Sequence, residues 1–225
     1  SVQSSSFNDQ VIYEPGFLKT GQGKPFSVFT PFKRRWIENF DMNFLDIAKP
    51  SKLKKSYPIQ GDLSNLKFAK THSANIDLWP AGESAAKEKL KNFLQSKAQS
   101  YSESRNSPII DGTSRISPYL ALGVLSPNRC IMEGLKLNNF DFSSGNQGIC
   151  KWIDEIVWRE FYRNIMHSFP KVSKNRPFQD YTNSIKWRHS NEELDAFYNG
   201  KTGFPIVDAG IRQMLKEGWM HNRLR

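Results

Sequence analysis

The sequence predicts a mainly α-helical protein, with a wholly helical domain and short loops from residue 79 onward. Three observations lead to this fold class. Apolar residues recur at the spacing of amphipathic helices. Helix-start signals such as Ser-Pro recur between these segments. Only one short segment, Val11–Tyr13, suggests a strand.

The first third of the chain contains few signals of regular structure. Residues 1–9 are rich in Ser and are predicted to be a frayed end. Thr30 is predicted to cap a helix over residues 31–40, because Pro is favoured at the first helical position. Residues 41–78 are rich in Lys, Ser and Pro, which predicts a solvated connector.

The helical domain begins with an amphipathic helix predicted over residues 82–104. Its inner face is expected to hold Ala85, Leu90, Phe93, Leu94 and Tyr101. Ser117 and Ser126 are each followed by Pro and are predicted to cap the next two helices. A loop rich in Gly, Ser and Asn then leads into a helix over residues 152–166.

Three more helix signals follow this long helix. A capping box at Ser190 starts a helix that is expected to end at Gly200. Pro205 opens another helix, which Gly218 ends. Its inward side is expected to hold Ile206, Ile211 and Leu215. The segment 221–225 is predicted to begin a further helix.

Composition narrows the classes of partner and site. The net charge of +10 points to a polyanionic partner, with nucleic acid first, although a generic basic surface would give the same value. Cys130 and Cys150 are interpreted as reduced, buried thiols in a reducing compartment. The four histidines lack metal-ligand spacing, so no metal is expected, and no apolar run is long enough to span a membrane. The chain has no initiator Met, which suggests a piece of a longer protein.

One face of the helix over residues 152–166 is unusual. Five side chains fall within an arc of about 120°: Trp152, Glu155, Trp158, Arg159 and Tyr162. The opposite side is apolar and predicts ordinary core. Two indoles beside a carboxylate and a guanidinium are costly to bury unless they line a site. The alternative is an amphipathic helix whose polar face is simply in water.

Two other segments carry chemistry. The hydroxyls of residues 113–117, together with Arg115, can hold a phosphate or pyrophosphate, although Ser and Thr before a helix are also ordinary caps. In the segment 219–225, Asn222 can hydrogen-bond the edge of a base or a flavin. Arg223 and Arg225 suit phosphates. A basic helix start on the surface would look the same.

Taken together, these segments resemble the DNA photolyase/cryptochrome family. The motifs that carry the resemblance are Gly-Thr-Ser-Arg-Ile-Ser-Pro from residue 112, Trp-Arg-Glu-Phe-Tyr at 158–162, Lys-Thr-Gly-Phe-Pro-Ile-Val-Asp-Ala at 201–209 and Trp-Met-His-Asn-Arg-Leu-Arg at 219–225. The last motif is similar to that of class I cyclobutane pyrimidine dimer photolyases. The resemblance implies light-driven splitting of pyrimidine dimers in DNA by fully reduced FAD.

The resemblance also implies a domain organisation. Residues 1–31 are expected to be the remnant of an α/β antenna domain, residues 32–78 the interdomain connector, and residues 79–225 a helical domain that binds FAD and DNA and is truncated at its C-terminus. The family also uses a second antenna chromophore such as methenyltetrahydrofolate. Lys174 lies where the family helps to hold such a folate, but Ser173 replaces the neighbouring Cys.

The resemblance assigns roles to individual residues. The implied FAD contacts are Tyr101, Thr113, Ser114, Arg115, Ile116, Ser117, Trp152, Arg159 and Arg225. The implied DNA contacts are Arg105, Glu155, Trp158, Arg159, Tyr162, Asn222 and Arg223. Among these, Glu155, Trp158 and Asn222 are expected to act on the dimer directly. Trp187 is expected to be the outermost tryptophan of a chain that reduces the flavin.

These assignments lead to expectations about partners and leave two alternatives. The expected partner is DNA that contains pyrimidine dimers, bound by a monomer in a bacterial-type cytoplasm, where it associates with the nucleoid when on DNA. We expect the 225 residues alone not to hold FAD tightly. The alternatives are a cryptochrome-like photoreceptor without repair activity and a non-catalytic, nucleic-acid-binding helical domain.

Overall fold

A computed structural model describes residue 4 and residues 9–45 and 77–225, and every regular element in these ranges is helical. The α-helices are α1 (Phe29–Glu38), α2 (Glu83–Ser96), α3 (Tyr101–Ser104), α4 (Ser117–Ala121), α5 (Pro127–Leu137), α6 (Gln147–Ser168), α7 (Asn191–Tyr198) and α8 (Pro205–Glu217). Short 3-10 helices cover Met42–Leu45, Ala98–Ser100, Val172–Lys174, Asp180–Ser184 and Asn222–Leu224. The prediction of a mainly helical fold is therefore confirmed.

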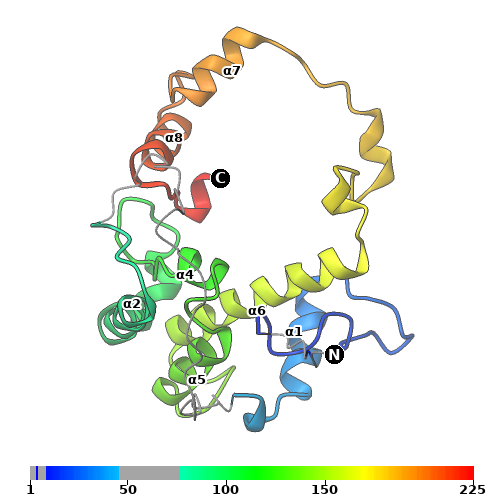
Figure 1. The fold of residues 1–225 in the computed structure, drawn as a ribbon, viewed down its shortest axis with the longest axis vertical. Helices are drawn as coiled ribbons and strands as arrows, with labels where there is room; N and C mark the ends of the chain where they lie inside the picture. Colours follow the sequence, from blue (N-terminus) through cyan, green and yellow to red (C-terminus); the bar gives the residue numbers. More distant parts are fainter. Residues whose placement is uncertain (1–3, 5–8, 46–76) are drawn as a thin grey trace, which may run out of the picture.

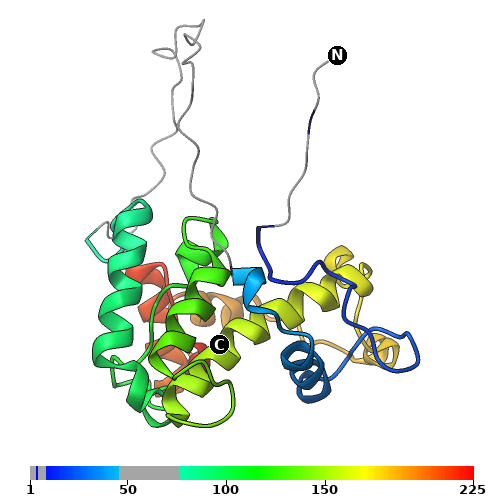
Figure 2. The same ribbon diagram turned by 90° about the horizontal axis from the view of Figure 1, so that it is seen from below.

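Helix α6 is the central element. It packs against α1, α3, α5 and the 3-10 turn Ala98–Ser100. In both views α2 and α5 lie to the left and α1 to the right, and α6 runs from beside α5 towards α1 (Figure 1, Figure 2). Trp36 from α1 and Trp152 from α6 are both almost fully buried in one continuous hydrophobic core. The apolar side of α6 thus organises the described part of the fold.

The start of α6 approaches the backbone of the preceding helical segment very closely. A Cβ atom placed on Gly148 would lie 2.3 Å from the carbonyl oxygen of Gln99 and 2.4 Å from that of Ala98. Asn146 caps the helix, because its side-chain oxygen accepts a hydrogen bond from Ile149 N at 3.0 Å. Because glycine has no side chain, α6 can pack this closely against the turn Ala98–Ser100.

The N-terminal segment is fixed to α6 by a buried carboxylate. Glu160 accepts hydrogen bonds from Ile12 N at 2.9 Å, Tyr13 N at 3.0 Å and the indole of Trp36 at 3.0 Å. The prediction of a strand over Val11–Tyr13 is wrong. The backbone N–H groups of Ile12 and Tyr13 are satisfied by a side chain of α6 instead of by a neighbouring strand.

After α6 the chain follows a wide arc through α7 and returns to α8, which lies near α2 and α4 (Figure 1). The indole of Trp79 donates a hydrogen bond to Glu217 O at 2.6 Å. The guanidinium of Arg115 lies 3.2 Å from the carboxylate of Glu217. These contacts fix the C-terminal end of α8, and with it the segment 219–225, across from α6.

Several helix boundaries follow their predicted signals. Ser126 and Ser190 cap α5 and α7, since their hydroxyls accept hydrogen bonds from Asn128 N at 3.2 Å and Glu193 N at 3.3 Å. Pro205 begins α8, and Gly218 ends it with a φ of 66° in the left-handed region.

Other boundary predictions are wrong in detail. Thr30 lies inside α1, which begins one residue earlier. Ser117 lies within α4, and no side-chain hydrogen bond caps that helix. The helix predicted over residues 82–104 is divided near Lys97 into α2, a 3-10 turn and α3. The segment 221–225 forms a single 3-10 turn.

Two predictions of which side chains are buried, one in α8 and one in α2, also need correction. In α8, Ile211 is buried, but Ile206 and Leu215 are 65% and 63% exposed. Within the described residues α8 packs chiefly on α7 and on the turn Asn222–Leu224, which leaves Ile206 and Leu215 uncovered. In α2 the buried alanine is Ala86 rather than Ala85. Most of the connector predicted over residues 41–78 lies outside the described residues.

Candidate functional site

A cleft of about 830 Å³ lies between α6, the loop before α4 and the C-terminal segment 219–225. Its lining includes every residue predicted to contact FAD or DNA: Tyr101, Arg105, Thr113, Ser114, Arg115, Ile116, Ser117, Trp152, Glu155, Trp158, Arg159, Tyr162, Asn222, Arg223 and Arg225. Trp187 and Lys174 do not line it. Three segments up to about a hundred residues apart in sequence therefore share one concave surface.

The loop 113–117 offers hydrogen-bonding groups that the described protein does not use. The hydroxyls of Thr113, Ser114 and Ser117 make no hydrogen bond within the described ranges. Arg115 adopts a φ of 49°, a left-handed conformation that is uncommon for a residue with a side chain. Residues with such uncommon backbone conformations are often found at functional sites.

The side chain of Arg115 is held by three groups. Its guanidinium lies 3.2 Å from the carboxylate of Glu217 and 3.3 Å from that of Asp111. It also stacks over the ring of Trp219 at 4.6 Å. The atom that approaches Asp111 is Nε, which is buried and makes no well-aligned hydrogen bond among the described residues. The loop is thus pinned in place, with three hydroxyls available to a ligand.

Trp152 forms the floor of the cleft. It is 1% exposed and packs against Phe93, with ring centroids 5.4 Å apart. Helical spacing predicted that Trp152 shares a face with Glu155 and Trp158, and all three line the cleft. Ile156 also lines it, although its position on the helix predicted core alone.

Glu155 forms an ion pair with Arg105 at the cleft. The guanidinium of Arg105 in turn lies 5.4 Å from the ring of Tyr101. Burial, reinforced by the nearby charge of Glu155, raises the pKa of Tyr101 to about 12. The Tyr101 hydroxyl therefore stays protonated at neutral pH and can donate a hydrogen bond.

Trp158 forms an aromatic wall with its neighbours. The rings of Phe29 and Trp158 are stacked, with centroids 3.7 Å apart and planes at 9°. Tyr162, one helical turn on, flanks the same indole at 5.6 Å. Tyr162 is 59% exposed, so this wall reaches solvent.

Arg159 connects the cleft to the N-terminal segment. Its guanidinium donates to Gln10 O, to Gln10 Oε1 at 2.8 Å and to Leu120 O at 3.1 Å. Burial lowers the pKa of Arg159. Because three of its hydrogen bonds go to protein groups, Arg159 acts as a structural clamp, and its contact to a ligand stays a prediction.

The C-terminal segment contributes a residue that sequence reasoning did not single out. His221 is 3% exposed and lines the cleft. Its Nδ1 accepts a hydrogen bond from Arg223 N at 3.1 Å, which assigns the proton of the neutral ring to Nε2. Burial and then the nearby arginines, Arg223 first, lower its pKa, so the ring is neutral. Within the described structure Nε2 is buried without a partner. The only signal was its place inside the motif at 219–225.

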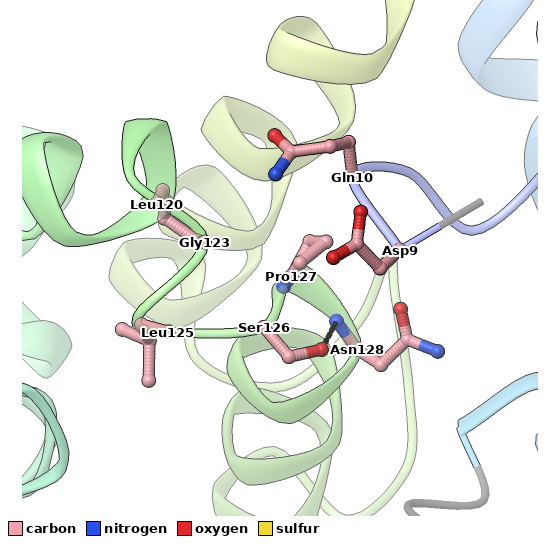
Figure 3. A pocket seen from close by; sticks show the side chains of 8 residues that line it. All are labelled: Asp9, Gln10, Leu120, Gly123, Leu125, Ser126, Pro127 and Asn128. Carbon is pink, nitrogen blue, oxygen red and sulfur yellow. Dashed lines mark hydrogen bonds between the residues drawn. The ribbon is translucent and has the colours of Figure 1, made fainter. Parts of the chain in front are cut away.

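Two smaller hollows are also present, the first of which shares Gln10 and Leu120 with the lining of the cleft. One, of about 190 Å³, is bounded by the start of α5 and by Asp9 and Gln10 (Figure 3). The other, of about 520 Å³, lies between α2 and α5, with Lys91 and Arg129 at its rim. Of the residues predicted to bind FAD or DNA, none lines either hollow.

The described ranges contain no group of three or more His, Cys, Asp or Glu residues arranged to hold a metal ion. None of the helices described there combines the length and the apolar character needed to cross a bilayer.

Comparison with known proteins connects this cleft to a family. The family model described as DNA photolyase matches residues 1–53, and that described as the FAD binding domain of DNA photolyase matches residues 152–225. The chain is 36% identical over 225 residues to a deoxyribodipyrimidine photo-lyase of Escherichia coli, covering 100% of this chain and 47% of that protein. The chain belongs to the DNA photolyase/cryptochrome family.

Other members of the family agree with this assignment. A deoxyribodipyrimidine photo-lyase of Neurospora crassa is 35% identical to this chain. The matched region includes 97% of this chain and 38% of the Neurospora protein. The crystal structure of a class III photolyase from Agrobacterium tumefaciens superposes with a TM-score of 0.83 at 35% identity, covering 97% of this chain and 46% of that one. A Synechocystis cryptochrome, at 23% identity and a TM-score of 0.71, shares the fold, over 96% of this chain and 46% of its own. The chain spans about half the length of the curated relatives it matches.

Assignment to class I stays a prediction.

The residues of the cleft fit a flavin dinucleotide. The three hydroxyls of the loop 113–117 and the buried His221 Nε2 have no hydrogen-bond partner in the described structure. A volume of about 830 Å³ is in the range of cofactor pockets. Residues 152–225 match the family model of the FAD binding domain of DNA photolyase.

Two residues assigned by resemblance lie elsewhere. Trp187 is 75% exposed, in the arc between α6 and α7. Lys174 is exposed at the end of a 3-10 turn, and the neighbouring Ser173 hydroxyl donates to Pro170 O at 2.8 Å. Their roles in electron transfer and in antenna binding stay predictions.

Proposed function

We propose that this chain is part of an enzyme that splits cyclobutane pyrimidine dimers in DNA, using FAD and light. A single observation carries the proposal: the hydroxyl-rich loop 113–117 and the Glu155–Trp158 face of α6 line the same cleft. The loop suits the phosphates of a dinucleotide, and the helix face suits a flat, polar ring system. When bound, reduced FAD would supply the light-driven electron transfer.

The aromatic wall serves the substrate. A dimer inside a duplex cannot reach a buried cofactor, and base flipping is the established solution for photolyases. Trp158 and Tyr162 would provide the surface on which the flipped dimer packs. Since a damaged base pair stacks poorly, the unstacking cost is smaller for the lesion than for normal DNA, which favours the lesion.

The polar groups at the cleft orient the dimer. Glu155, held in place by Arg105, would accept hydrogen bonds from the N–H groups of the dimer. Asn222 would contact the dimer from the opposite side. Arg223, whose guanidinium is bonded to Asn106 at 3.0–3.1 Å, would contact the flanking phosphate.

The protein's charge supports binding to DNA. A net charge of +10 would supply much of the affinity through phosphate contacts, so binding should weaken as salt is raised. Buried side chains, with Trp152 as the floor, would exclude water from the cofactor. Arg225 would lie close to the cofactor ring.

Two residues outside the cleft, Trp187 and Lys174, would serve electron supply and light harvesting. Trp187 would pass electrons from the surface towards the flavin, and Lys174 would help to hold a second antenna chromophore such as methenyltetrahydrofolate. The enzyme would act as a monomer in the cytoplasm, associated with the nucleoid when bound to DNA. Class I specificity for cyclobutane dimers rests on the segment 219–222.

The test is repair of a defined lesion by the flavin-loaded holoprotein. An oligonucleotide with one thymine dimer is incubated with the protein in blue light or in darkness, and intact thymines are measured. We expect dimer loss only in light. A flavin spectrum without repair would favour a cryptochrome-like photoreceptor, and DNA binding without any flavin would favour a non-catalytic domain.

A further inference from the structure

The rear of the aromatic wall is formed by a residue from far earlier in the chain. Phe29, the first residue of α1, covers one face of the Trp158 indole at 3.7 Å and 9°. Tyr162 flanks the same ring at 5.6 Å and 28°. Trp158 is only partly buried and also lines the cleft, so the part of its indole that Phe29 and Tyr162 leave uncovered borders the space for a ligand.

Phe29 is itself held in place. Its ring contacts Phe161 edge to face, with centroids 5.8 Å apart. Further along α1, Trp36 is fixed by its hydrogen bond to Glu160 at 3.0 Å. Helix α1 is therefore anchored on the same helix, α6, that carries Trp158, and the two stacked rings cannot shift independently.

This arrangement affects how a flat ligand is recognised. An indole with both faces open can tilt about its side-chain torsions and must lose that freedom when a base stacks on it. The Phe29 ring removes the freedom before binding. A wall ordered in advance binds more tightly than one that orders on contact, because the ordering cost is no longer part of the binding step.

We propose that Phe29 is a positioning residue for lesion recognition, fixing the plane of Trp158 so that a flipped pyrimidine dimer packs against the exposed part of the indole. The inference rests on the proposed function, because it takes the dimer as the ligand. Phe29 acts through Trp158 and does not contact the substrate. The N-terminal part of the chain would thereby shape the substrate side of the cleft.

The test measures binding in darkness, separately from repair. The flavin-loaded holoprotein is titrated with a duplex that contains one thymine dimer and with the same duplex undamaged. Three variants are compared with wild type: Phe29→Leu, which keeps apolar volume but removes the stacked ring; Phe29→Ala; and Phe29→Tyr, which restores an aromatic ring. Phe26→Ala is the matched control, since Phe26 packs on Phe32 at 5.9 Å and not on Trp158.

We expect Phe29→Leu and Phe29→Ala to weaken binding of the damaged duplex about tenfold, which equals about 1.4 kcal/mol, and to leave binding of the undamaged duplex within about twofold. Phe29→Tyr and Phe26→Ala should bind both duplexes as wild type does. If Phe29→Ala fails to fold, Phe29→Leu decides the question.

Several outcomes would overturn the inference. Unchanged lesion binding in Phe29→Leu would do so, as would equal losses for both duplexes or an equal loss in Phe26→Ala. If the proposed function itself is wrong, the result is distinguishable from these outcomes, because the wild-type protein would then bind the damaged and the undamaged duplex equally.

Discussion

Arg105 and Glu155 form an ion pair that joins the end of α3 to the middle of α6 at the edge of the cleft. Only 10% of the Arg105 side chain and 26% of the Glu155 side chain are exposed. The pair keeps Glu155 in a fixed position with its charge balanced. Glu155 is therefore ready to accept hydrogen bonds from a ligand without first being ordered.

This pair leads to a prediction for the holoprotein. Glu155→Ala should lower the rate of light-driven dimer repair on the order of tenfold to hundredfold, because stabilisation of charge on the substrate is lost. DNA affinity should fall less, because phosphate contacts provide most of it. Repair kinetics and equilibrium binding are measured on the same preparation. Glu103→Ala, an exposed carboxylate in α3, is the control, and equal losses in repair and binding would contradict the role of Glu155.

The hydroxyls of the loop 113–117 allow a cleaner test of cofactor binding. Thr113→Val and Ser114→Ala remove groups that bond to nothing in the described structure, so the apoprotein should keep its stability. Each should weaken FAD binding about tenfold, since a hydrogen bond to a charged phosphate contributes about 1.5–3 kcal/mol. Titration of the apoprotein with FAD measures this. Ser107→Ala lies outside the cleft lining and should bind FAD normally; unaltered affinity in the loop variants would argue against phosphate binding there.

Glu160 should be important for stability. Replacing it with Gln exchanges a carboxylate that accepts three hydrogen bonds for an amide whose NH₂ group would face backbone donors. We expect the free energy of unfolding to fall by about 2–4 kcal/mol, measured by urea denaturation. Glu38→Gln alters only a surface pair with Arg35 and should change stability by less than about 1 kcal/mol. Similar values for both variants would refute the anchoring role.

Gly148 should tolerate no side chain. Gly148→Ala would drive a methyl group into two carbonyl oxygens, so α6 or the turn Ala98–Ser100 must shift. We expect a loss of at least about 1–3 kcal/mol in the free energy of unfolding. Gly21→Ala is the control, because a Cβ there would have no heavy atom within 4 Å. A Gly148→Ala protein as stable as the control would show that the close approach is relaxed in solution.

Asp208 should make stability depend on acidic pH. Hydrogen bonds from Thr202, first from its hydroxyl, lower the pKa of Asp208 below its ordinary 3.8. The folded form then binds its proton less readily than the unfolded form, so the stabilisation is present above about pH 4 and is lost as the pH falls through the folded-state pKa.

Asp208→Asn should therefore unfold at a lower temperature than wild type at pH 7, with the difference shrinking towards pH 2. Thermal midpoints across this range provide the measurement. Asp195→Asn, at an exposed site on α7, should follow wild type at every pH. A difference that stays constant down to pH 2 would count against the Asp208 assignment.

The sequence by itself determined the local features of this protein. Helical spacing placed Trp152, Glu155 and Trp158 on one face, and all three line the cleft. Ser126 and Ser190 began their helices as predicted. These features depend on residues within one or two helical turns, so a short stretch of sequence contains the whole signal.

Only the tertiary structure decided which distant groups meet. Nothing local marks Glu160 as the partner of Tyr13, which precedes it by 147 residues, because a glutamate on a helix is usually in water. The same holds for Phe29 behind Trp158. Sequence motifs predicted the residues that line the cleft, whereas long-range packing decided what supports them. Burial and hydrogen-bond pairing depend on elements that meet only after the chain folds.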